Sequence, residues 1–310
     1  MREIVLIQPE YNFSEISDIA KSFITLHKKS VIIITGPTGS GKTELAQKIE
    51  SLQSSMLINA DSRQIFIQVN IGSNKPVIVD HAIYDGHYTS ITNEEKKYWL
   101  MDCENLKSTY SAQDFREQVR SMITKLHNQN IVPILVGGSI HWIKSAISSS
   151  ITPYYVSDEN LYAEICSKTL QELQLLYRQH YPDYEINESD WANPRRLGRA
   201  IEFKLITGHS IYDSTKFIED NNDYLIFQTT IDKVDHRKKI KNGVINRLNN
   251  GWIEEVENII KVYNYEILDK LGLGYKIIGE YIKNGKIDDV DKLIELITIA
   301  EMHYAKKQIF

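Results

Sequence analysis

Residues 36–43 form a glycine-rich segment of the pattern G-x-x-x-x-G-K-[ST], which is typical of loops that bind phosphate groups. Its glycines allow successive backbone amides to turn toward phosphate oxygens, and a helix beginning there adds the positive end of its dipole. Lys42 supplies a mobile positive charge, and the hydroxyl of Thr43 is suited to ligate Mg²⁺. We therefore expect a site for a diphosphate or triphosphate, with Thr43 as the metal ligand. The predicted phosphate-binding residues are Gly36, Pro37, Thr38, Gly39, Ser40, Gly41, Lys42 and Thr43.

A carboxylate follows the next apolar run, because residues 56–60 are succeeded by Asp61. In open parallel sheets, ligand-facing residues gather at the carboxyl ends of the strands. An aspartate there is also a common turn former, but beside a phosphate loop we interpret Asp61 as catalytic. The third apolar run, 131–136, ends in Gly137 and Gly138 without a carboxylate. That argues modestly against simple nucleoside triphosphate hydrolysis, which normally uses an acidic residue at a nearby strand end.

The elements that must position these residues are predicted from hydrophobic periodicity. Short apolar runs at 31–35, 56–60 and 131–136 indicate buried parallel strands, and helical spacing is found at 43–52 and 112–127. Strands that alternate with helices are typical of an α/β fold. We therefore predict a P-loop NTPase-like three-layer core with a parallel sheet.

The composition of the chain changes after residue 148, since the residues that follow are polar and carry no strand signal. We therefore predict a helical insertion at 150–193. The core is then expected to comprise residues 30–149 and 194–310, the latter ending in helices. Residues 1–29 are interpreted as an N-terminal extension with a weak helical pattern. A long helix is predicted to stop at Thr207 and Gly208.

Composition limits the class of protein. The 310 residues are 42% hydrophobic and 25% charged, as in ordinary folded proteins, and the net charge is −5. The two cysteines, Cys103 and Cys166, exclude a four-cysteine zinc site and argue against a disulfide framework. No apolar stretch is long enough to cross a bilayer or to serve as a signal peptide core. We expect a cytoplasmic protein with no membrane contact.

Two basic segments stand out from the acidic average. Residues 191–210 hold four basic residues and one acidic residue, and residues 232–247 hold six basic residues and two acidic residues. Such runs are usually solvated helix faces, yet they are also the local charge that RNA binding requires.

Several motifs, taken together and in order, resemble the tRNA dimethylallyltransferases. They are Ile33–Thr43, Asn59–Phe66, Asn70–Pro76, Pro133–Ser139, Asn193–Glu202, Gly274–Lys276 and Tyr304–Gln308. The resemblance implies Mg²⁺-assisted transfer of a dimethylallyl group from dimethylallyl diphosphate to the exocyclic amine of the adenine 3′ of a tRNA anticodon. The phosphate loop would then hold a prenyl diphosphate instead of ATP.

The resemblance also assigns roles to residues. Asp61 would be the general base, Lys42 would stabilise the leaving diphosphate, and Ser139 would stand near the reacting centre where the family usually has threonine. An arginine of the 233–247 segment would bind diphosphate, with Arg237 and Arg247 as alternatives. The partners would be dimethylallyl diphosphate and a tRNA anticodon stem-loop, bound by a monomer. The implied tRNA-contacting residues are Asp61, Ser62, Arg63, Gln64, Arg195, Arg196, Leu197, Gly198, Arg199, Leu271, Gly272, Leu273, Gly274, Tyr275 and Lys276.

Three other functions remain open from the residues: a small-molecule P-loop kinase, a prenyltransferase acting on free adenine nucleotides, and an RNA-binding protein without activity. The last alternative is motivated by residues 77–100, which diverge from the family pattern. That segment contains His81 and His87 with Asp80 and Asp85. Their spacing fits no familiar zinc pattern, so we interpret them as part of a surface loop.

Overall fold

The computed structural model describes residues 1–310 apart from 85, 149, 152–157, 183–185, 187, 212–215, 218–219, 286–288 and 310. The chain divides into two compact units. The first unit comprises Met1–Ile147 and Asn221–Phe310, and the second comprises Ser148–Asp220.

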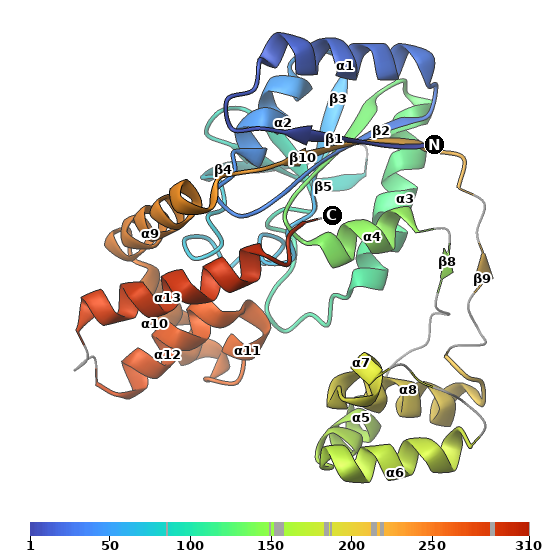
Figure 1. Ribbon diagram of the computed structural model, residues 1–310, viewed down its shortest axis with the longest axis vertical. Coiled ribbons are helices and arrows are strands. Elements are labelled where there is room, and N and C mark those ends of the chain that lie inside the picture. Colours follow the sequence, from blue (N-terminus) through green and yellow to red (C-terminus); the bar gives the residue numbers. More distant parts are fainter. Residues whose placement is uncertain are drawn as a thin grey trace. The chain divides into compact units, whose positions relative to one another are not determined.

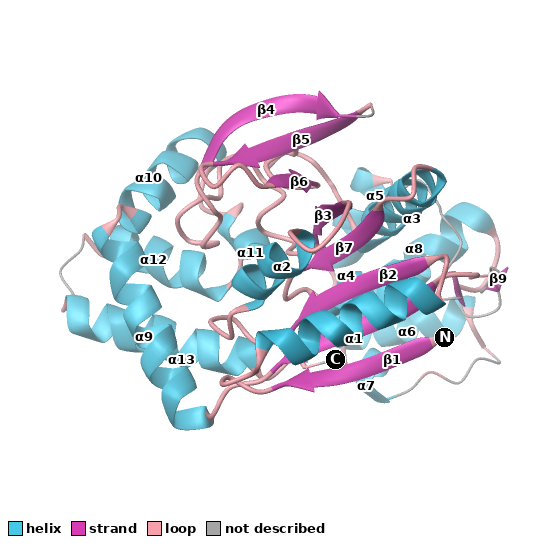
Figure 2. Cartoon of the chain, turned by 90° about the horizontal axis from the view of Figure 1, so that it is seen from above, coloured by secondary structure: helices cyan, strands magenta, loops and turns pink. Residues whose placement is uncertain are grey.

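The first unit is built on a sheet of eight strands among the described residues, in the order β1-β10-β2-β7-β3-β6-β5-β4 (Figures 1 and 2). Strands β1, β10, β2, β7, β3 and β6 run parallel, and β5 and β4 are added antiparallel at one edge. The strands are β1 (Arg2–Ile7), β2 (Ser30–Thr35), β3 (Ser55–Asn59), β4 (Ile78–Tyr84), β5 (His87–Thr92), β6 (Lys97–Trp99), β7 (Val132–Val136) and β10 (Asp223–Thr229).

Helices cover both faces of this sheet because its central strands are apolar on both sides. Residues 31–34 of β2 are fully buried. Helices α1 (Phe13–Leu26) and α2 (Lys42–Glu50) pack on one face through side chains such as Phe23 and Leu45. Helices α3 (Ala112–Asn128) and α4 (Ile140–Ile147) pack on the other. The predicted three-layer α/β core is confirmed.

Residues 1–29 are part of this core, so the prediction of an N-terminal extension was wrong. Strand β1 pairs in parallel with β10, Arg2 opposite Tyr224 and Ile7 opposite Thr229. Helix α1 runs alongside β1 and β2 on one face of the sheet, as Figure 2 shows, and buries Ile16, Ala20 and Phe23. Strand β1 carries only a short apolar run, residues 4–7, and it lies at the edge of the sheet with most of its side chains exposed, so it lacks the fully buried apolar pattern of the central strands.

In the described part of the chain after β10, five helices form a layer beside the sheet, drawn in orange to red in Figure 1. They are α9 (Lys233–Asn249), α10 (Trp252–Tyr263), α11 (Leu268–Leu271), α12 (Leu273–Lys283) and α13 (Val290–Ala305). The buried rings of Trp252 and Tyr275 meet edge to face, 5.6 Å apart, where α10 and α12 pack. Among the described residues, no helix combines the length and apolar composition needed to span a bilayer.

The segment predicted as a surface loop around His81 and His87 is instead the β-hairpin of β4 and β5, which extends the edge of the sheet. His81 stacks on Tyr88, with ring centroids 4.9 Å apart. In the part of the chain that the structure describes, no group of three or more histidine, cysteine or acidic residues could hold a metal ion. Asp85 lies outside the described residues.

The second unit consists of α5 (Glu159–Cys166), α6 (Leu170–His180), α7 (Glu188–Trp191), α8 (Pro194–Thr207) and the short pair β8 (Ser150–Ile151) and β9 (Lys216–Phe217). The predicted insertion, 150–193, was too short, because the second unit extends to Asp220. Helix α8 buries Leu197 and Ile201 against Ile165 and Leu173, so it belongs with α5 and α6 and not with the sheet. Its predicted end is confirmed, because Gly208 has φ 74° and its N–H reaches Lys204.

Candidate active site

The phosphate loop joins the end of β2 to the start of α2, as predicted. Its glycines are required by geometry, because Gly36, Gly39 and Gly41 have φ of 141°, 80° and 85°. A Cβ on Gly36 would also lie 2.3 Å from the Thr229 hydroxyl of the neighbouring strand β10. Helix α2 begins at Lys42, so its N-terminus points into the loop.

Side chains from distant parts of the first unit hold this loop. The Ser40 hydroxyl donates to the Pro37 carbonyl at 2.7 Å and lies 2.5 Å from the hydroxyl of Thr229. Nε2 of His236, on α9, lies 2.8 Å from the Thr38 carbonyl oxygen. The contacts from Thr229 and His236 were missed in the sequence because β10 and α9 carry no phosphate-binding motif.

Among the residues that the structure describes, no carboxylate forms an ion pair with the ammonium of Lys42. Its ammonium donates to the Pro37 carbonyl at 2.7 Å. Burial lowers the pKa of Lys42 to about 8, and the more distant Asp61 carboxylate offsets only part of that effect. A lysine that is desolvated in this way is stabilised by an anion, so the loop suits a phosphate ligand.

Lys42 and Asp61 open onto one cavity of about 330 Å³. Loop residues 38–43 and the end of β3 form part of its wall, and residues 73–76 form another part. The lining residues are Thr38, Gly39, Gly41, Lys42, Thr43, Glu44, Asp61, Gln64, Ser73, Asn74, Pro76, Tyr98, Met101, Val136 and Gly137. The predicted phosphate loop and the predicted carboxylate are thus brought together.

The donors in this cavity fit Mg²⁺. The ion prefers oxygen ligands and usually takes few of them from protein, keeping waters and phosphate oxygens for the rest. Thr43 lines the cavity. Its hydroxyl would hold the ion next to a diphosphate bound in the loop, with phosphate oxygens and waters as the other ligands.

Asp61 is fixed in a tight turn at the end of β3. Its N–H donates to Oδ1 of Asn59 at 3.0 Å, and the N–H of Arg63 donates to Oδ1 of Asp61 at 3.0 Å. Asn59 is held in turn by the Leu100 carbonyl, to which its amide donates at 2.7 Å. Among the described residues, no protein donor reaches Oδ2 of Asp61. One carboxylate oxygen therefore orients the group, and the other remains for a ligand.

Ser139 lies behind this turn and not in the cavity wall. Its hydroxyl accepts the N–H of Ser62 at 2.9 Å and donates to the Ser62 hydroxyl at 3.1 Å. A Cβ on Gly137 would come within 2.2 Å of the Ala60 carbonyl carbon, which explains why glycine follows β7. Ser139, predicted as catalytic, is thus placed as a positioning residue for the Asp61 turn, and Ser62 is its partner.

Arg63 and Gln64 are held by protein groups on the far side of the turn. The Arg63 guanidinium lies over the ring of Tyr304 at 4.6 Å. Its burial acts to lower the pKa, but Asp61 and Tyr304 outweigh that effect and raise the pKa of Arg63. The Gln64 amide lines the cavity and donates to the Ser73 carbonyl at 3.1 Å.

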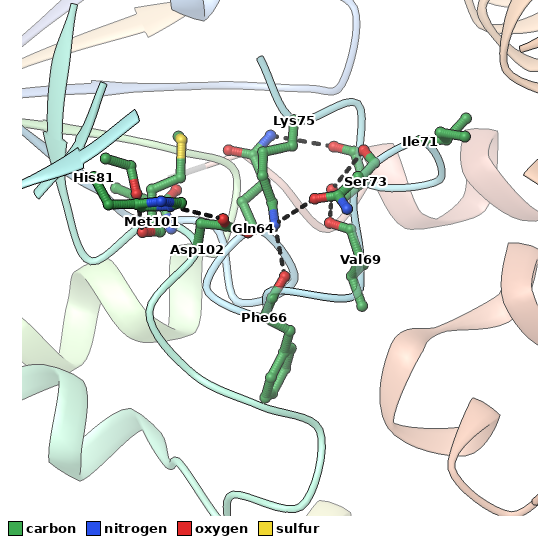
Figure 3. Close-up of polar contacts among 12 residues, drawn as sticks. Gln64, Phe66, Val69, Ile71, Ser73, Lys75, His81, Met101 and Asp102 are labelled. Carbon is green, nitrogen blue, oxygen red and sulfur yellow. Dashed lines mark hydrogen bonds and ion pairs between the residues drawn. The ribbon is translucent and has the colours of Figure 1, made fainter. Parts of the chain in front are cut away.

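A buried ion pair supports the cavity wall formed by residues 73–76, as Figure 3 shows. The ammonium of Lys75, whose side chain is 1% exposed, donates to Asp102 at 2.6 Å and to the Phe66 carbonyl at 2.6 Å. Nε2 of His81 lies 3.0 Å from the other oxygen of Asp102. Burial lowers the pKa of Lys75 in spite of the neighbouring carboxylate.

The same wall is tied to the helical layer by Glu255 of α10. Its carboxylate accepts three successive backbone N–H groups, from Asn70 at 2.9 Å, Ile71 at 2.7 Å and Gly72 at 3.0 Å. It also accepts the hydroxyl of Tyr275 at 2.7 Å. A single carboxylate thus takes up donors that the bend at 70–72 would otherwise bury unpaired.

Neither arginine considered for diphosphate binding lines the cavity. Arg247 donates to the Gly72 carbonyl at 3.0 Å and to Glu301 at 2.8 Å, and Arg237 pairs with Glu295. Lys239 lies nearer to the phosphate loop, since its Cβ is 3.9 Å from where a Cβ on Gly39 would be. Lys239 is one of six basic residues in the segment 232–247, and nothing in the sequence distinguishes it from the other five.

Five of the residues assigned to tRNA contact are buried, which corrects that prediction. Leu197, Gly198, Leu271, Gly274 and Tyr275 all lie inside their own unit. A Cβ on Gly198 would meet Ile165 at 3.3 Å, and one on Gly274 would meet Trp252 at 2.7 Å. These residues pack helices and do not offer a surface to RNA.

The other members of the two segments are exposed or half-buried, and several pair with acidic side chains of their own unit, Arg196 with Asp190 among them. In the second unit, Arg195 and Arg196 are exposed, and Arg199 lies 3.6 Å above the ring of Tyr162 and pairs with Glu202 at 2.8 Å. In the first unit, Leu273 is 55% exposed. The exposed ammonium of Lys276 pairs with Asp269 at 2.9 Å, and Gly272 packs beside Arg63.

The family described as IPP transferase matches residues 64–310. A tRNA dimethylallyltransferase of Phytoplasma australiense is 32% identical over 291 residues, which cover 90% of this chain and 87% of the relative. The chain belongs to the IPP transferase family.

Solved structures of proteins with related names share its fold. A tRNA isopentenylpyrophosphate transferase of Bacillus halodurans has a TM-score of 0.60 and 23% identity, covering 90% of this chain and 85% of that one. A eukaryotic dimethylallyltransferase acting on tRNA has a TM-score of 0.66 and 18% identity, covering 90% of this chain and 68% of that one. The IPP transferase fold therefore extends over both units of the chain.

Proposed function

We propose that this member of the IPP transferase family transfers a dimethylallyl group from dimethylallyl diphosphate to the exocyclic amine of the adenine 3′ of a tRNA anticodon. Its curated relatives carry the name tRNA dimethylallyltransferase. The observation that carries the proposal is the single cavity that holds both Lys42 of the phosphate loop and the Asp61 carboxylate. A group-transfer reaction with a diphosphate leaving group needs both.

In this reaction the adenine nitrogen forms a bond to the first carbon of the dimethylallyl group, and the bond from that carbon to the diphosphate oxygen breaks. Negative charge grows on the diphosphate. The partly desolvated ammonium of Lys42 and the loop amides stabilise that charge, because they are already oriented before the bond breaks. Mg²⁺, held by Thr43, would supply further positive charge to stabilise the leaving diphosphate.

The proton released from the amine goes to Asp61. An adenine amine is a weak nucleophile, so removal of its proton during bond formation lowers the barrier. The N–H of Arg63 holds one oxygen of the carboxylate, and Oδ2 is left to take the proton. The Ser62–Ser139 pair fixes the turn that carries the base.

A tRNA substrate is supported by the exposed charge in both units. Arg195 and Arg196 are exposed in the second unit, and Lys238, Lys239 and Lys241 are exposed on α9 in the first. A free nucleotide would not need these surfaces. An unpaired anticodon-loop base also costs little to unstack. We further propose that the enzyme acts as a cytoplasmic monomer, which sedimentation at working concentration would test.

The decisive experiment is incubation of the full chain with dimethylallyl diphosphate, Mg²⁺ and bulk tRNA, followed by mass analysis of the nucleosides. We expect an adenosine that carries one added dimethylallyl group. The matched control is Asp61→Asn, which keeps the oxygen that accepts the Arg63 N–H. It should lower turnover by about 10²- to 10⁴-fold with tRNA affinity unchanged. Unmodified tRNA together with phosphate transfer from ATP to a small molecule would favour a kinase and refute the proposal.

A further inference from the structure

One face of the C-terminal helix and of the turn after it touches three separate segments of the site. Residues 301 and 304 are three apart in α13, which puts them on one side of that helix, and residue 308 lies beyond the turn that follows it. Glu301 pairs with Arg247, which holds the Gly72 carbonyl. Tyr304 lies under Arg63 of the Asp61 turn.

The third contact, made by Gln308, reaches the phosphate loop itself. Its side-chain oxygen accepts both the backbone N–H of Thr38 at 2.8 Å and the hydroxyl of Thr38 at 3.0 Å. Its side-chain nitrogen donates to the Gly138 carbonyl at 3.3 Å. Gln308 is 2% exposed, so none of these groups is freely solvated.

A planar amide that bonds at both ends fixes the separation of the two segments it joins. One segment is the loop that would hold the leaving diphosphate. The other is the turn after β7, where Gly137 packs directly against Ala60 and hence against the Asp61 turn. Gln308 therefore sits between the part that binds the leaving group and the part that holds the base. Sub-ångström placement of such parts is what preorganised electrostatic stabilisation requires.

We propose that Gln308 is a positioning residue that sets the conformation of the phosphate loop for diphosphate binding, acting through Thr38. Thr38 is then an anchor of the loop, because both of its donors are used by Gln308, and the diphosphate is bound by residues 39–43. This inference deepens the proposed function, and its prediction about the KM for dimethylallyl diphosphate rests on that function. Its prediction about pyrophosphate binding can be tested without any prenyl transfer.

The test is Gln308→Met in the full chain, which fills nearly the same volume but removes all three hydrogen bonds. Calorimetry with inorganic pyrophosphate and Mg²⁺ should give a Kd raised about tenfold or more. The KM for dimethylallyl diphosphate should rise by a similar factor, and the KM for tRNA should stay the same. The matched control is Gln118→Met on the exposed side of α3, which loses one bond to the Tyr110 hydroxyl and should bind pyrophosphate as the wild type does.

A second variant approaches the same contact from the other side. A Cβ on Gly138 would lie 2.3 Å from Nε2 of Gln308, so Gly138→Ala should displace the amide and weaken pyrophosphate binding similarly. If Gln308→Met does not fold, the pyrophosphate affinity of Gly138→Ala decides the role of Gln308. The double variant Thr38→Val with Gln308→Met should lose less pyrophosphate-binding free energy than the two single variants lose in sum, because both substitutions remove the same contact.

Wild-type pyrophosphate affinity in a folded Gln308→Met or Gly138→Ala protein would overturn the inference. Equal loss of affinity for tRNA and for dimethylallyl diphosphate would also overturn it, since that indicates general damage. A wild-type protein that fails to modify tRNA refutes the proposed function instead, and the pyrophosphate measurements still decide the role of Gln308.

Discussion

Replacement of Lys42 by methionine should stabilise the ligand-free protein at neutral pH while it abolishes diphosphate binding. Burial lowers the pKa of this lysine from 10.5 to about 8. Below about pH 8 the group is protonated in both the folded and the unfolded state, and the folded state carries the full cost of a desolvated charge. Methionine keeps the length of the side chain and removes the charge.

The size of the effect follows from the pKa difference. One pKa unit corresponds to about 1.36 kcal/mol, so the shift from 10.5 to about 8 gives an upper bound of about 3 kcal/mol for the gain in unfolding free energy. Lys42 is only half-buried by its side-chain surface, and the variant loses the hydrogen bond to the Pro37 carbonyl, worth about 1 kcal/mol. We therefore expect a net gain in the free energy of unfolding of less than about 2 kcal/mol at about pH 7.

The sign of the pH dependence provides a sharper check. Between about pH 8 and 10.5 the unfolded wild type binds more protons at this position than the folded wild type, so wild-type stability rises with pH relative to the variant. Urea unfolding without ligand at about pH 7 and about pH 10 should show the advantage of Lys42→Met shrinking toward zero. The control on the same helix is Lys48→Met, since Lys48 is exposed and paired with Glu44 at 2.7 Å. It should show no comparable gain.

A Lys42→Met protein that is less stable than wild type at neutral pH, or a difference that does not change with pH, would refute this reasoning. Mg²⁺ and pyrophosphate should raise the Tm of the wild type, because a ligand that binds the folded state stabilises it. The variant should show little of that rise.

Three further predictions concern other parts of the first unit. Glu255→Ala should lower the free energy of unfolding in urea by about 2–4 kcal/mol, because four donors lose their acceptor; an unchanged value would mean that water replaces the carboxylate. Lys75→Met should lower the free energy of unfolding by about 3–5 kcal/mol, because buried Asp102 loses the ammonium that pairs with it. Adding Asp102→Leu should recover most of that stability, and two losses that simply add would contradict the ion-pair argument. Binding of tRNA should weaken steeply with salt, and alanine at Lys238, Lys239 and Lys241 of α9 should make the log–log slope shallower by about 2; an equal slope would exclude those lysines as phosphate contacts.

Local chemistry was enough to predict the phosphate loop and the carboxylate beside it. A phosphate loop needs glycines, a lysine and a hydroxyl within a few residues, so its signal is contained in 36–43. The carboxyl ends of β2 and β3 meet at one edge because parallel strands share a direction, which brought Asp61 to the loop.

The supports of the site could not be predicted in this way. Gln308 meets Thr38 across 270 positions, and Glu255 meets Asn70 across 185. A polar side chain that anchors a distant backbone group leaves no periodicity in its own neighbourhood.

The errors among the predicted RNA contacts have a different physical origin. Whole motifs were assigned as contacts, but a helix shows a partner only one of its faces. In α8, Leu197 and Ile201 are four apart and buried, whereas Arg195 and Arg196 are exposed. The helical periodicity within the motif distinguishes the buried residues from the exposed ones and could have been used to do so.

The pairing of β1 with β10 has a consequence for synthesis of the chain. Arg2 finds its partner Tyr224 more than two hundred residues later, after the whole second unit has been made. At about 5–20 residues per second a ribosome needs roughly 10 to 45 s to cover that interval. Throughout it, the nascent strand exposes the backbone groups of Ile4, Val5 and Leu6 without their native neighbour, which makes it a natural client for chaperones that shield unpaired strands.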